Sequence, residues 1–369
     1  MALLNLPNEL LRNISEYLGS ERDINAIAQA NRHLYCLLDS YLYRCNIQQS
    51  GSLALLWAAQ HGQEATAQKL LKENANLQAT NNNNEAPLLF AAANGHRQVV
   101  KLLVDKGAKV DAQGGQHGNA LQAASFHGHE AVVKMLLDKG SNVNVQGGHY
   151  GNALQAASAR GHEQVVKLLL DKGADVNAQS VHYGTALYVA SERGHAAVVK
   201  LLLDKGAEVN AQGGHYGNAL YAASERGHAA VVKLLLDKGA DVNAQGRGYD
   251  NALYAASERG YDNALYAASE RGHAAVVKLL LDKGADVNAQ GTYYGNALHA
   301  ASEEGHEQVV KLLLDKGSDV NVQGGDYGNA LQAASARGDE AVVKLLLDNG
   351  ADANAQNGDY GNALQAASE

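Results

Sequence analysis

Residues 191–207 read Ser-Glu-Arg-Gly-His-Ala-Ala-Val-Val-Lys-Leu-Leu-Leu-Asp-Lys-Gly-Ala, and the same stretch returns unchanged at 224–240 and 269–285. A shorter motif, Asn-Ala-Leu or a close variant, recurs over most of the chain, mainly at a period of 33 residues. It begins at Asn119, Asn152, Thr185, Asn218, Asn251, Asn263, Asn296, Asn329 and Asn362. A fixed period of this length predicts a stack of supersecondary units, because a globule with one core needs no such repetition.

Each period has the pattern of two short helices followed by a loop. In residues 151–182, Asn152 is a good helix N-cap, and Gly161 separates two apolar helical patterns. Gly173 is a typical helix stop, after which the chain is rich in turn formers. Neither helix is long enough to be stable alone in water. The pattern therefore predicts units that must cover one another.

Composition narrows the class of protein further. The formal charge of −9 argues against a nucleic-acid or anionic-membrane surface, since both require a basic face. The only two cysteines, Cys36 and Cys45, are too few for a disulfide framework. The first residues lack the pattern of a signal peptide, and no apolar run is long enough to span a bilayer. We expect a soluble protein of the cytoplasm or nucleus.

The repeated residues resemble ankyrin repeats. The resemblance rests on Ala86-Pro87-Leu88-Leu89 at the start of a first helix, on Gly161-His162 between helices, and on residues 173–178 after the second helix. Only Pro87 stands at the proline position of the family pattern. The resemblance implies an all-α ankyrin-repeat solenoid over residues 51–369, with about nine full repeats and a partial tenth. Each repeat would be a helix-turn-helix with a hairpin loop.

The resemblance also implies where a partner would bind. In ankyrin-like arrays the loop tips and the first helices line a concave face, and tyrosine suits such a surface because it is large, stiff and amphipathic. An alternative is that each tyrosine packs against the next loop and rigidifies the stack. The predicted partner-binding residues are His149, Tyr150, His182, Tyr183, Tyr188, Glu192, Arg193, His215, Tyr216, Tyr221, Glu225, Arg226, Tyr266, Arg271, Tyr293 and Tyr294.

No pattern predicts catalysis, a metal or a cofactor. The repeated histidines fall one to a unit, and His162-Glu163 lacks the second histidine of a zinc helix. In ankyrin-like stacks this histidine ties its turn to the neighbouring unit by hydrogen bonds, and we expect the same role here. The chain has neither a phosphate-binding loop nor a nucleophile elbow.

Residues 1–48 break the period and predict a small three-helix domain. Leu10, Ile14 and Leu18 form one apolar stripe after Pro7. The segment resembles an F-box, a family that binds a Skp1-type adaptor of cullin-RING ubiquitin ligases. The resemblance implies that the adaptor-binding residues are Leu6, Pro7, Leu10, Ile14 and Leu18. The alternative is a helical cap that shields the apolar side chains of the first repeat.

The period is interrupted once. Residues 249–260 are followed immediately by the same twelve residues at 261–272, so that Asn218 and Asn263 are 45 apart. We expect one copy to keep the stack in phase and the other to be looped out or to form an extra turn of helix. The preferred function is a monomeric substrate-receptor subunit of a ubiquitin ligase that binds a target protein through its array. The alternative is an ankyrin scaffold without a ligase link.

Overall fold

The computed structural model describes residues 53–180, 183–213, 217–244, 263–290, 295–324, 328–356, 358 and 361–368. The F-box-like segment, and with it the predicted adaptor-binding residues Leu6, Pro7, Leu10, Ile14 and Leu18, lies outside this part of the chain. The described helices fall into two compact units, residues 1–157 with 171–174, and residues 158–170 with 175–369. Each unit is described by itself.

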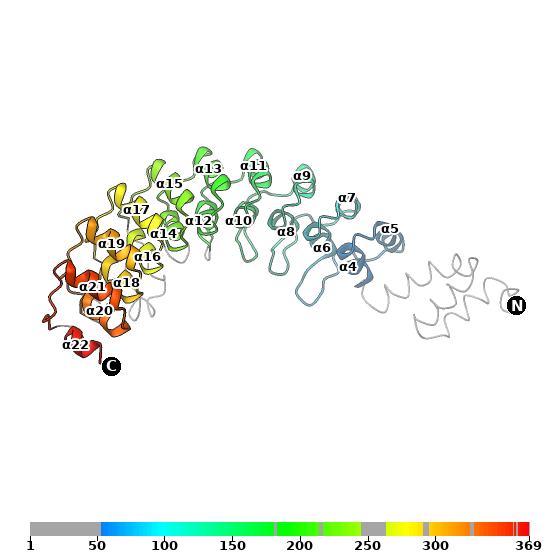
Figure 1. The fold of residues 1–369 in the computed structure, drawn as a ribbon. Helices are drawn as coiled ribbons and strands as arrows, with labels where there is room; N and C mark the ends of the chain where they lie inside the picture. Colours follow the sequence, from blue (N-terminus) through cyan, green and yellow to red (C-terminus); the bar gives the residue numbers. More distant parts are fainter. Residues whose placement is uncertain are drawn as a thin grey trace, which may run out of the picture. The chain divides into compact units, whose positions relative to one another are not determined.

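The described residues contain helices and isolated bridges but no strand, which confirms the all-helical prediction for this part of the chain. Short first helices alternate with longer second helices (Figure 1). The first helices are α4 (Leu53–Gln60), α6 (Pro87–Ala93), α8 (Ala120–Phe126), α10 (Ala153–Ala159), α12 (Ala186–Glu192), α14 (Ala219–Glu225), α16 (Ala264–Glu270), α18 (Ala297–Glu303), α20 (Ala330–Arg337) and α22 (Ala363–Ala366). The second helices are α5 (Glu64–Lys72), α7 (Arg97–Asp105), α9 (Glu130–Asp138), α11 (Glu163–Asp171), α13 (Ala196–Asp204), α15 (Ala229–Asp237), α17 (Ala274–Asp282), α19 (Glu307–Asp315) and α21 (Glu340–Asp348).

The first helix begins where a polar side chain caps it. The Asn119 side chain accepts a hydrogen bond from the Gln122 backbone N–H at 2.9 Å, and the Gln122 side chain accepts one from the Asn119 N–H at 2.7 Å. This reciprocal capping box satisfies two N–H groups that the start of a helix leaves unpaired. Ala123 and Ala124 are fully buried, and their small side chains let the neighbouring helices approach closely.

A glycine turn separates the two helices of each repeat. Gly194 has a φ of +75°, a conformation that favours glycine, and a Cβ there would lie 2.7 Å from the His228 ring of the next repeat. The second helix α13 then buries Val198, Val199 and Leu202. It leaves Lys200 exposed. One face of this helix is therefore apolar, as its sequence predicts.

Contacts in the first unit join neighbouring repeats. The first helices α4, α6 and α8 pack in that order, and the second helices α5, α7 and α9 form a parallel series beside them (Figure 1). Each first helix also packs on the second helix of its own repeat. The apolar core is therefore distributed along the stack.

The second unit has the same arrangement from α12 to α22, and the duplicated sequence does not interrupt it. Helix α14 packs on α16, and α15 packs on α17, although 45 residues separate the equivalent positions. The His273 ring reaches the Glu225 carbonyl oxygen at 2.9 Å, as other histidines do one repeat apart. The copy that contains α16 thus occupies the in-phase position. The other copy, residues 249–260, lies outside the described residues.

Candidate functional site

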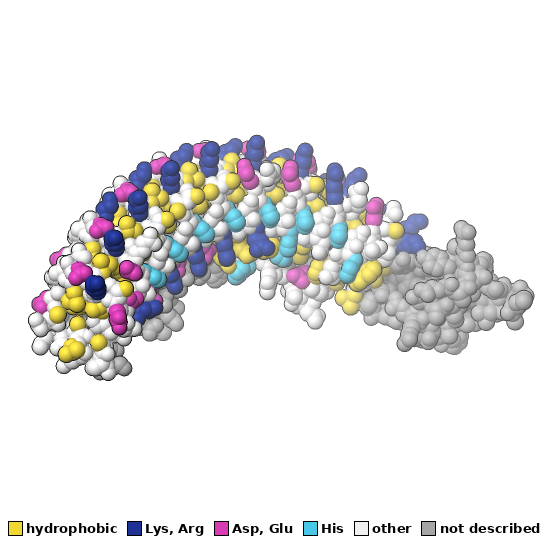
Figure 2. Space-filling model, viewed as in Figure 1, with side chains coloured by type: hydrophobic (Ala, Val, Ile, Leu, Met, Phe, Trp, Pro, Cys, Tyr) yellow, Lys and Arg dark blue, Asp and Glu magenta, His cyan; other side chains and the backbone are white. Residues whose placement is uncertain are grey.

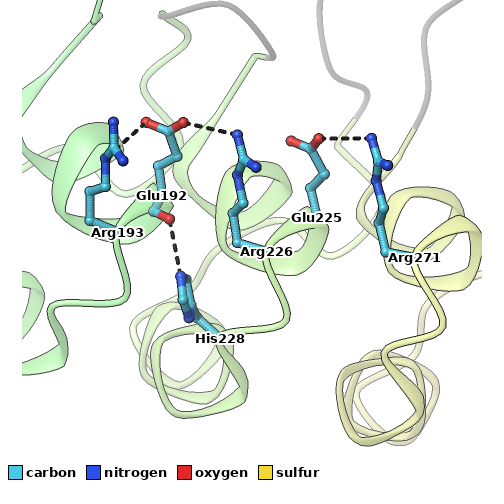
Figure 3. A network of polar contacts seen from close by, with 6 residues as sticks. All are labelled: Glu192, Arg193, Glu225, Arg226, His228 and Arg271. Atoms are coloured by element: carbon cyan, nitrogen blue, oxygen red, sulfur yellow. Dashed lines mark hydrogen bonds and ion pairs between the residues drawn. The ribbon is translucent and has the colours of Figure 1, made fainter.

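Histidines of the glycine turns link neighbouring repeats within each unit. The Nε2 atom of His228 lies 3.0 Å from the Glu192 carbonyl oxygen, at the end of the preceding first helix (Figure 3). The pairs His96–Gln60, His129–Ala93, His195–Ala159, His273–Glu225 and His306–Glu270 repeat this contact at 2.9 to 3.2 Å. Each contact satisfies a carbonyl group that the end of a helix leaves unpaired. The predicted structural role of the repeated histidines is confirmed.

One turn replaces this histidine with an acidic residue and keeps the link by other means. Asp339 stands where most of the other turns have histidine, and its carboxylate caps α21 by accepting from the Val342 N–H at 3.2 Å. The Arg337 guanidinium donates instead to the Glu303 carbonyl oxygen at 3.0 Å. The position is therefore defined by the need to satisfy a helix-end carbonyl group, and either residue type can do so.

The fourth residue of the Asn-Ala-Leu motif holds the loop of the next repeat. The Gln122 side-chain amide donates to the carbonyl oxygens of Val145, Gly147 and Gly151 at 3.1, 3.1 and 2.9 Å. Gln332 donates in the same way to Gly361 at 2.6 Å. This side chain is consequently directed into the stack, between its own helix and the following loop.

The geometry of this position corrects part of the predicted partner-binding face. Tyr188 and Tyr266 occupy the same position and are only 2% and 6% exposed, so their side chains are not available to a partner. Tyr221, also at this position, is partly exposed. The prediction was wrong for the first two because variation at this position was interpreted as a sign of an exposed surface. In the structure, Gln, Tyr and His are alternative residues for a buried position.

The ends of the first helices in the second unit carry a ladder of ion pairs. Arg226 Nη2 lies 3.3 Å from Glu192 Oε1, and Arg271 Nη2 lies 3.4 Å from Glu225 Oε1 (Figure 3). Arg193 Nε completes the ladder at 4.0 Å from Glu192 Oε2. Within the ladder the side chains of Glu192 and Glu225 are only 12% and 8% exposed. Glu192 and Glu225 were predicted as partner contacts, but their recessed carboxylates serve mainly to hold the arginines.

The first unit has aromatic residues where the ladder has ion pairs. The Phe126 ring lies 5.0 Å from the rings of His127 and Tyr150, and 5.2 Å from that of His117. The His149 ring lies 5.3 Å from Tyr150. Burial lowers the pKa of His117 and so favours its neutral form, against the opposing effect of Glu85. Ring pairs at these distances stabilise one another and keep the aromatic surface rigid.

Phe126, His117 and His127 occupy first-helix-end and loop-tip positions of the predicted face, but they are not among the individual contacts predicted from the sequence. A signal was present, because the positions equivalent to Phe126 carry Ala or Glu in the following repeats and those equivalent to His127 carry mostly Arg. Of the predicted loop-tip residues, His149 is exposed, while Tyr150 and Tyr183 are partly exposed. His182, His215, Tyr216, Tyr293 and Tyr294 lie outside the described residues.

The second helices carry a separate row of charges. Lys238 Nζ lies 2.7 Å from Asp204 Oδ1, and Lys139 lies 2.8 Å from Asp105. The hydrogen bond from lysine lowers the pKa of both aspartates. Figure 2 shows this row along the second helices, beside the row of histidines. Because all four side chains are more than 40% exposed, these pairs contribute little to stability.

The described residues contain no group of three or more His, Cys, Asp or Glu that could hold a metal ion. A hollow of about 270 Å³ lies against α7 in the first unit, and its lining includes Glu64, His96 and Arg97. The Nε2 atom of His96 is already engaged with the Gln60 carbonyl oxygen at 2.9 Å. A search of these same ranges finds no helix with the length and apolarity that crossing a bilayer requires.

Comparison with known proteins places these features in a family. The family model for ankyrin repeats, three copies long, matches residues 24–114, 55–147, 121–213, 155–246, 247–324 and 265–357. The chain is an ankyrin-repeat protein. Ankyrin repeats are typically non-catalytic and indicate a protein–protein interaction module.

The ankyrin-repeat protein is also similar to a solved structure. The crystal structure of the human ASB11 ankyrin repeat domain matches it with a TM-score of 0.53 and 27% sequence identity. The match covers 63% of this chain and 98% of that domain. The curated proteins contain no match.

Proposed function

We propose that this ankyrin-repeat protein binds a target protein through the loop tips and first-helix ends of its array, and that residues 1–48 connect it to a Skp1-type adaptor as an F-box does. The observation that carries the first part is the row of half-exposed arginines, held in place by recessed carboxylates on consecutive repeats. Fixed polar side chains on a rigid scaffold lower the entropy that binding would otherwise cost.

Support for the adaptor comes from the sequence alone. Leu6, Pro7, Glu9 and Leu10 match the opening of an F-box, and Ile14 and Leu18 continue the apolar stripe. The protein would then be the substrate receptor of a ubiquitin ligase and would itself catalyse no reaction. We further propose that it acts as a monomer in the cytoplasm or nucleus.

Co-purification with a Skp1-type adaptor tests the proposal. The wild-type chain is expected to retain the adaptor, and Leu10→Asp is expected to lose it because a charge in the apolar stripe disrupts the contact. Circular dichroism provides the control that the array remains folded. A wild-type chain that retains no adaptor contradicts the ligase role and leaves protein binding by the array untouched.

One observation favours the alternative of an N-terminal cap. Leu53 and Trp57 on α4 are each 52% exposed, and these apolar side chains belong to the first repeat after the F-box-like segment. Trp57 is the only tryptophan of the chain, so its fluorescence reports on this surface alone. A cap predicts that Leu10→Asp shifts the Trp57 emission to longer wavelength. An unchanged emission spectrum contradicts the cap.

A further inference from the structure

In the ladder of the second unit, the arginine side chains are more exposed than those of Glu192 and Glu225. The side chains of Arg193, Arg226 and Arg271 are 52%, 48% and 52% exposed. Their partners Glu192 and Glu225 are 12% and 8% exposed, whereas Glu270, with Oε2 3.9 Å from Arg271 Nε, is 40% exposed. A molecule that approaches this surface therefore meets the three guanidinium groups and Glu270 more readily than Glu192 and Glu225, whose carboxylates alternate with the guanidinium groups along the row (Figure 3).

The guanidinium groups keep most of their hydrogen-bonding capacity. Each has five N–H donors in a planar fork that fits a carboxylate. Arg226 uses Nη2 for Glu192, and Arg271 uses Nη2 for Glu225. The Nε atom of Arg193 is 4.0 Å from Glu192, which is too long for a hydrogen bond. The remaining donors are available on a surface that the recessed carboxylates have already ordered.

The arginines are placed at the regular spacing of the stack. Arg193 and Arg226 follow α12 and α14, and Arg271 follows α16, which packs directly on α14 despite the duplicated sequence. Packed helices lie about 8–10 Å apart. A peptide in the extended polyproline-II conformation rises about 3.1 Å per residue with three residues per turn, so every third side chain lies on the same face. Every third residue of an extended peptide therefore falls opposite a successive arginine.

We infer that Arg193, Arg226 and Arg271 form a docking row for an extended segment of a partner protein that carries Asp or Glu at every third position. This inference rests on the proposed protein-binding function and adds the chemistry of the partner. Charge complementarity selects carboxylates, because the three exposed guanidinium groups outnumber the one exposed carboxylate that pairs with them, Glu270. A basic segment would face guanidinium groups and could not reach Glu192 or Glu225. The chain's net charge of −9 opposes a densely charged polyanion such as nucleic acid, whereas a short segment with spaced carboxylates contacts only the row.

Binding of a designed peptide to the full chain tests the spacing. The probe is a fluorescently labelled peptide with Glu at every third position and Ser between, measured by fluorescence anisotropy. Control peptides have the same composition with the Glu residues clustered, or Lys in place of Glu. The spaced peptide is expected to bind at least about threefold more tightly than the clustered peptide, and more weakly as salt is added. Equal binding of the two acidic peptides, or preferred binding of the Lys peptide, overturns the inference.

Two charge reversals in one repeat test the location. Arg193→Glu removes one guanidinium and leaves the Arg226–Glu192 pair intact, since that pair does not involve Arg193. It is expected to weaken binding of the spaced peptide by about three- to tenfold, the range for one exposed ion pair lost and one repulsion gained. Lys200→Glu makes the same change in net charge on α13 and is expected to leave the affinity nearly unchanged. If both variants weaken binding equally, the effect is one of net charge and the row is not the site.

Crosslinking of the full chain to its protein partners separates this inference from the proposed function. If the Arg193→Glu variant captures a partner as efficiently as the wild type, the docking row is contradicted, but the protein-binding function stands. A wild-type chain that captures no protein contradicts the function itself. A phosphorylated peptide that binds far more tightly than the spaced carboxylate peptide overturns the choice of carboxylates.

Discussion

The imidazole of His299 lies at the same repeat position as the amides of Gln122 and Gln332, but it can take up a proton and they cannot. It is 4% exposed, and its Nδ1 lies 3.0 Å from the Asn296 side-chain oxygen. Burial lowers its pKa from 6.5 to about 4, against the opposing effect of a hydrogen bond with the Gly328 backbone. The ring is therefore neutral in the folded protein at pH 7.

This shift predicts a loss of stability in acid. Between pH 6.5 and about 4 the unfolded chain binds a proton at His299 that the folded chain does not bind. The free energy of unfolding is thus fully retained above pH 6.5 and falls through that window, by roughly 3 kcal/mol in all. His299→Gln introduces the residue of the equivalent positions and is expected to remove this part of the pH dependence.

Urea unfolding of both proteins at a series of pH values measures the effect. The other histidines are common to both chains, so the difference between the two stability profiles isolates His299. If the difference in free energy of unfolding between the two proteins stays constant from pH 7 to pH 4, the pKa of His299 is not lowered.

Alanine substitutions at Gly194 and Gly206 separate the cost of backbone strain from the cost of lost packing within one repeat. Both have positive φ, at +75° and +90°, so alanine is strained at either position. A Cβ at Gly206 meets nothing within 4 Å, whereas one at Gly194 would displace the His228 ring and its hydrogen bond to Glu192. Gly206→Ala is expected to cost about 1–2 kcal/mol, and Gly194→Ala about 1–2 kcal/mol more. If chemical denaturation shows that both variants lose the same free energy of unfolding, the linking role of His228 is contradicted.

The duplicated sequence offers a test of how the repeats keep their regular stacking. Without residues 249–260, the segment from Gln245 to Asn263 is as long as the segment from Gln212 to Asn218. The period of 33 is then restored. The contacts of α16 with the preceding repeat come from the copy at 261–272, and those of α17 come from residues that follow both copies. Deletion of 249–260 is therefore expected to leave the helix content unchanged and to change the free energy of unfolding by less than about 1 kcal/mol.

Circular dichroism and thermal unfolding check this prediction. Deletion of 261–272 gives the same amino-acid sequence, so one shortened chain serves for both copies. A marked loss of helix in the shortened chain means that residues 249–260 contribute contacts that the in-phase copy does not supply.

The sequence predicts the helices well and the binding surface only in part. Asn caps, Gly turns and Val-Leu stripes are local signals, so the helix pair of each repeat could be predicted from residues near one another in the chain. The burial of Tyr188, Tyr266 and Glu225 depends on the next repeat, which covers them. A pattern read along one repeat cannot show such burial, because the covering atoms come from another.

For the whole molecule, one leucine position shows that neighbours create the core. Leu298 and Leu331 are 1% and 2% exposed, each with another repeat after it, whereas Leu364 at the equivalent position of α22 is 81% exposed. The residue type is the same, and only the neighbour differs. A stack held by such contacts tolerates the loss of a complete repeat but not of half a repeat.

We expect complete repeats to shield one another and together to present a binding surface. Deletion of 186–218 removes one period and joins Thr185 to Ala219, which restores the motif, while deletion of 186–195 removes only α12 and its turn. The direct measurement is thermal unfolding of both variants by circular dichroism. We predict wild-type ellipticity per residue and cooperative unfolding for the first, and loss of helix and cooperativity for the second. Equal disruption by both deletions would contradict this expectation, because a protein with one central core cannot distinguish a full period from part of one.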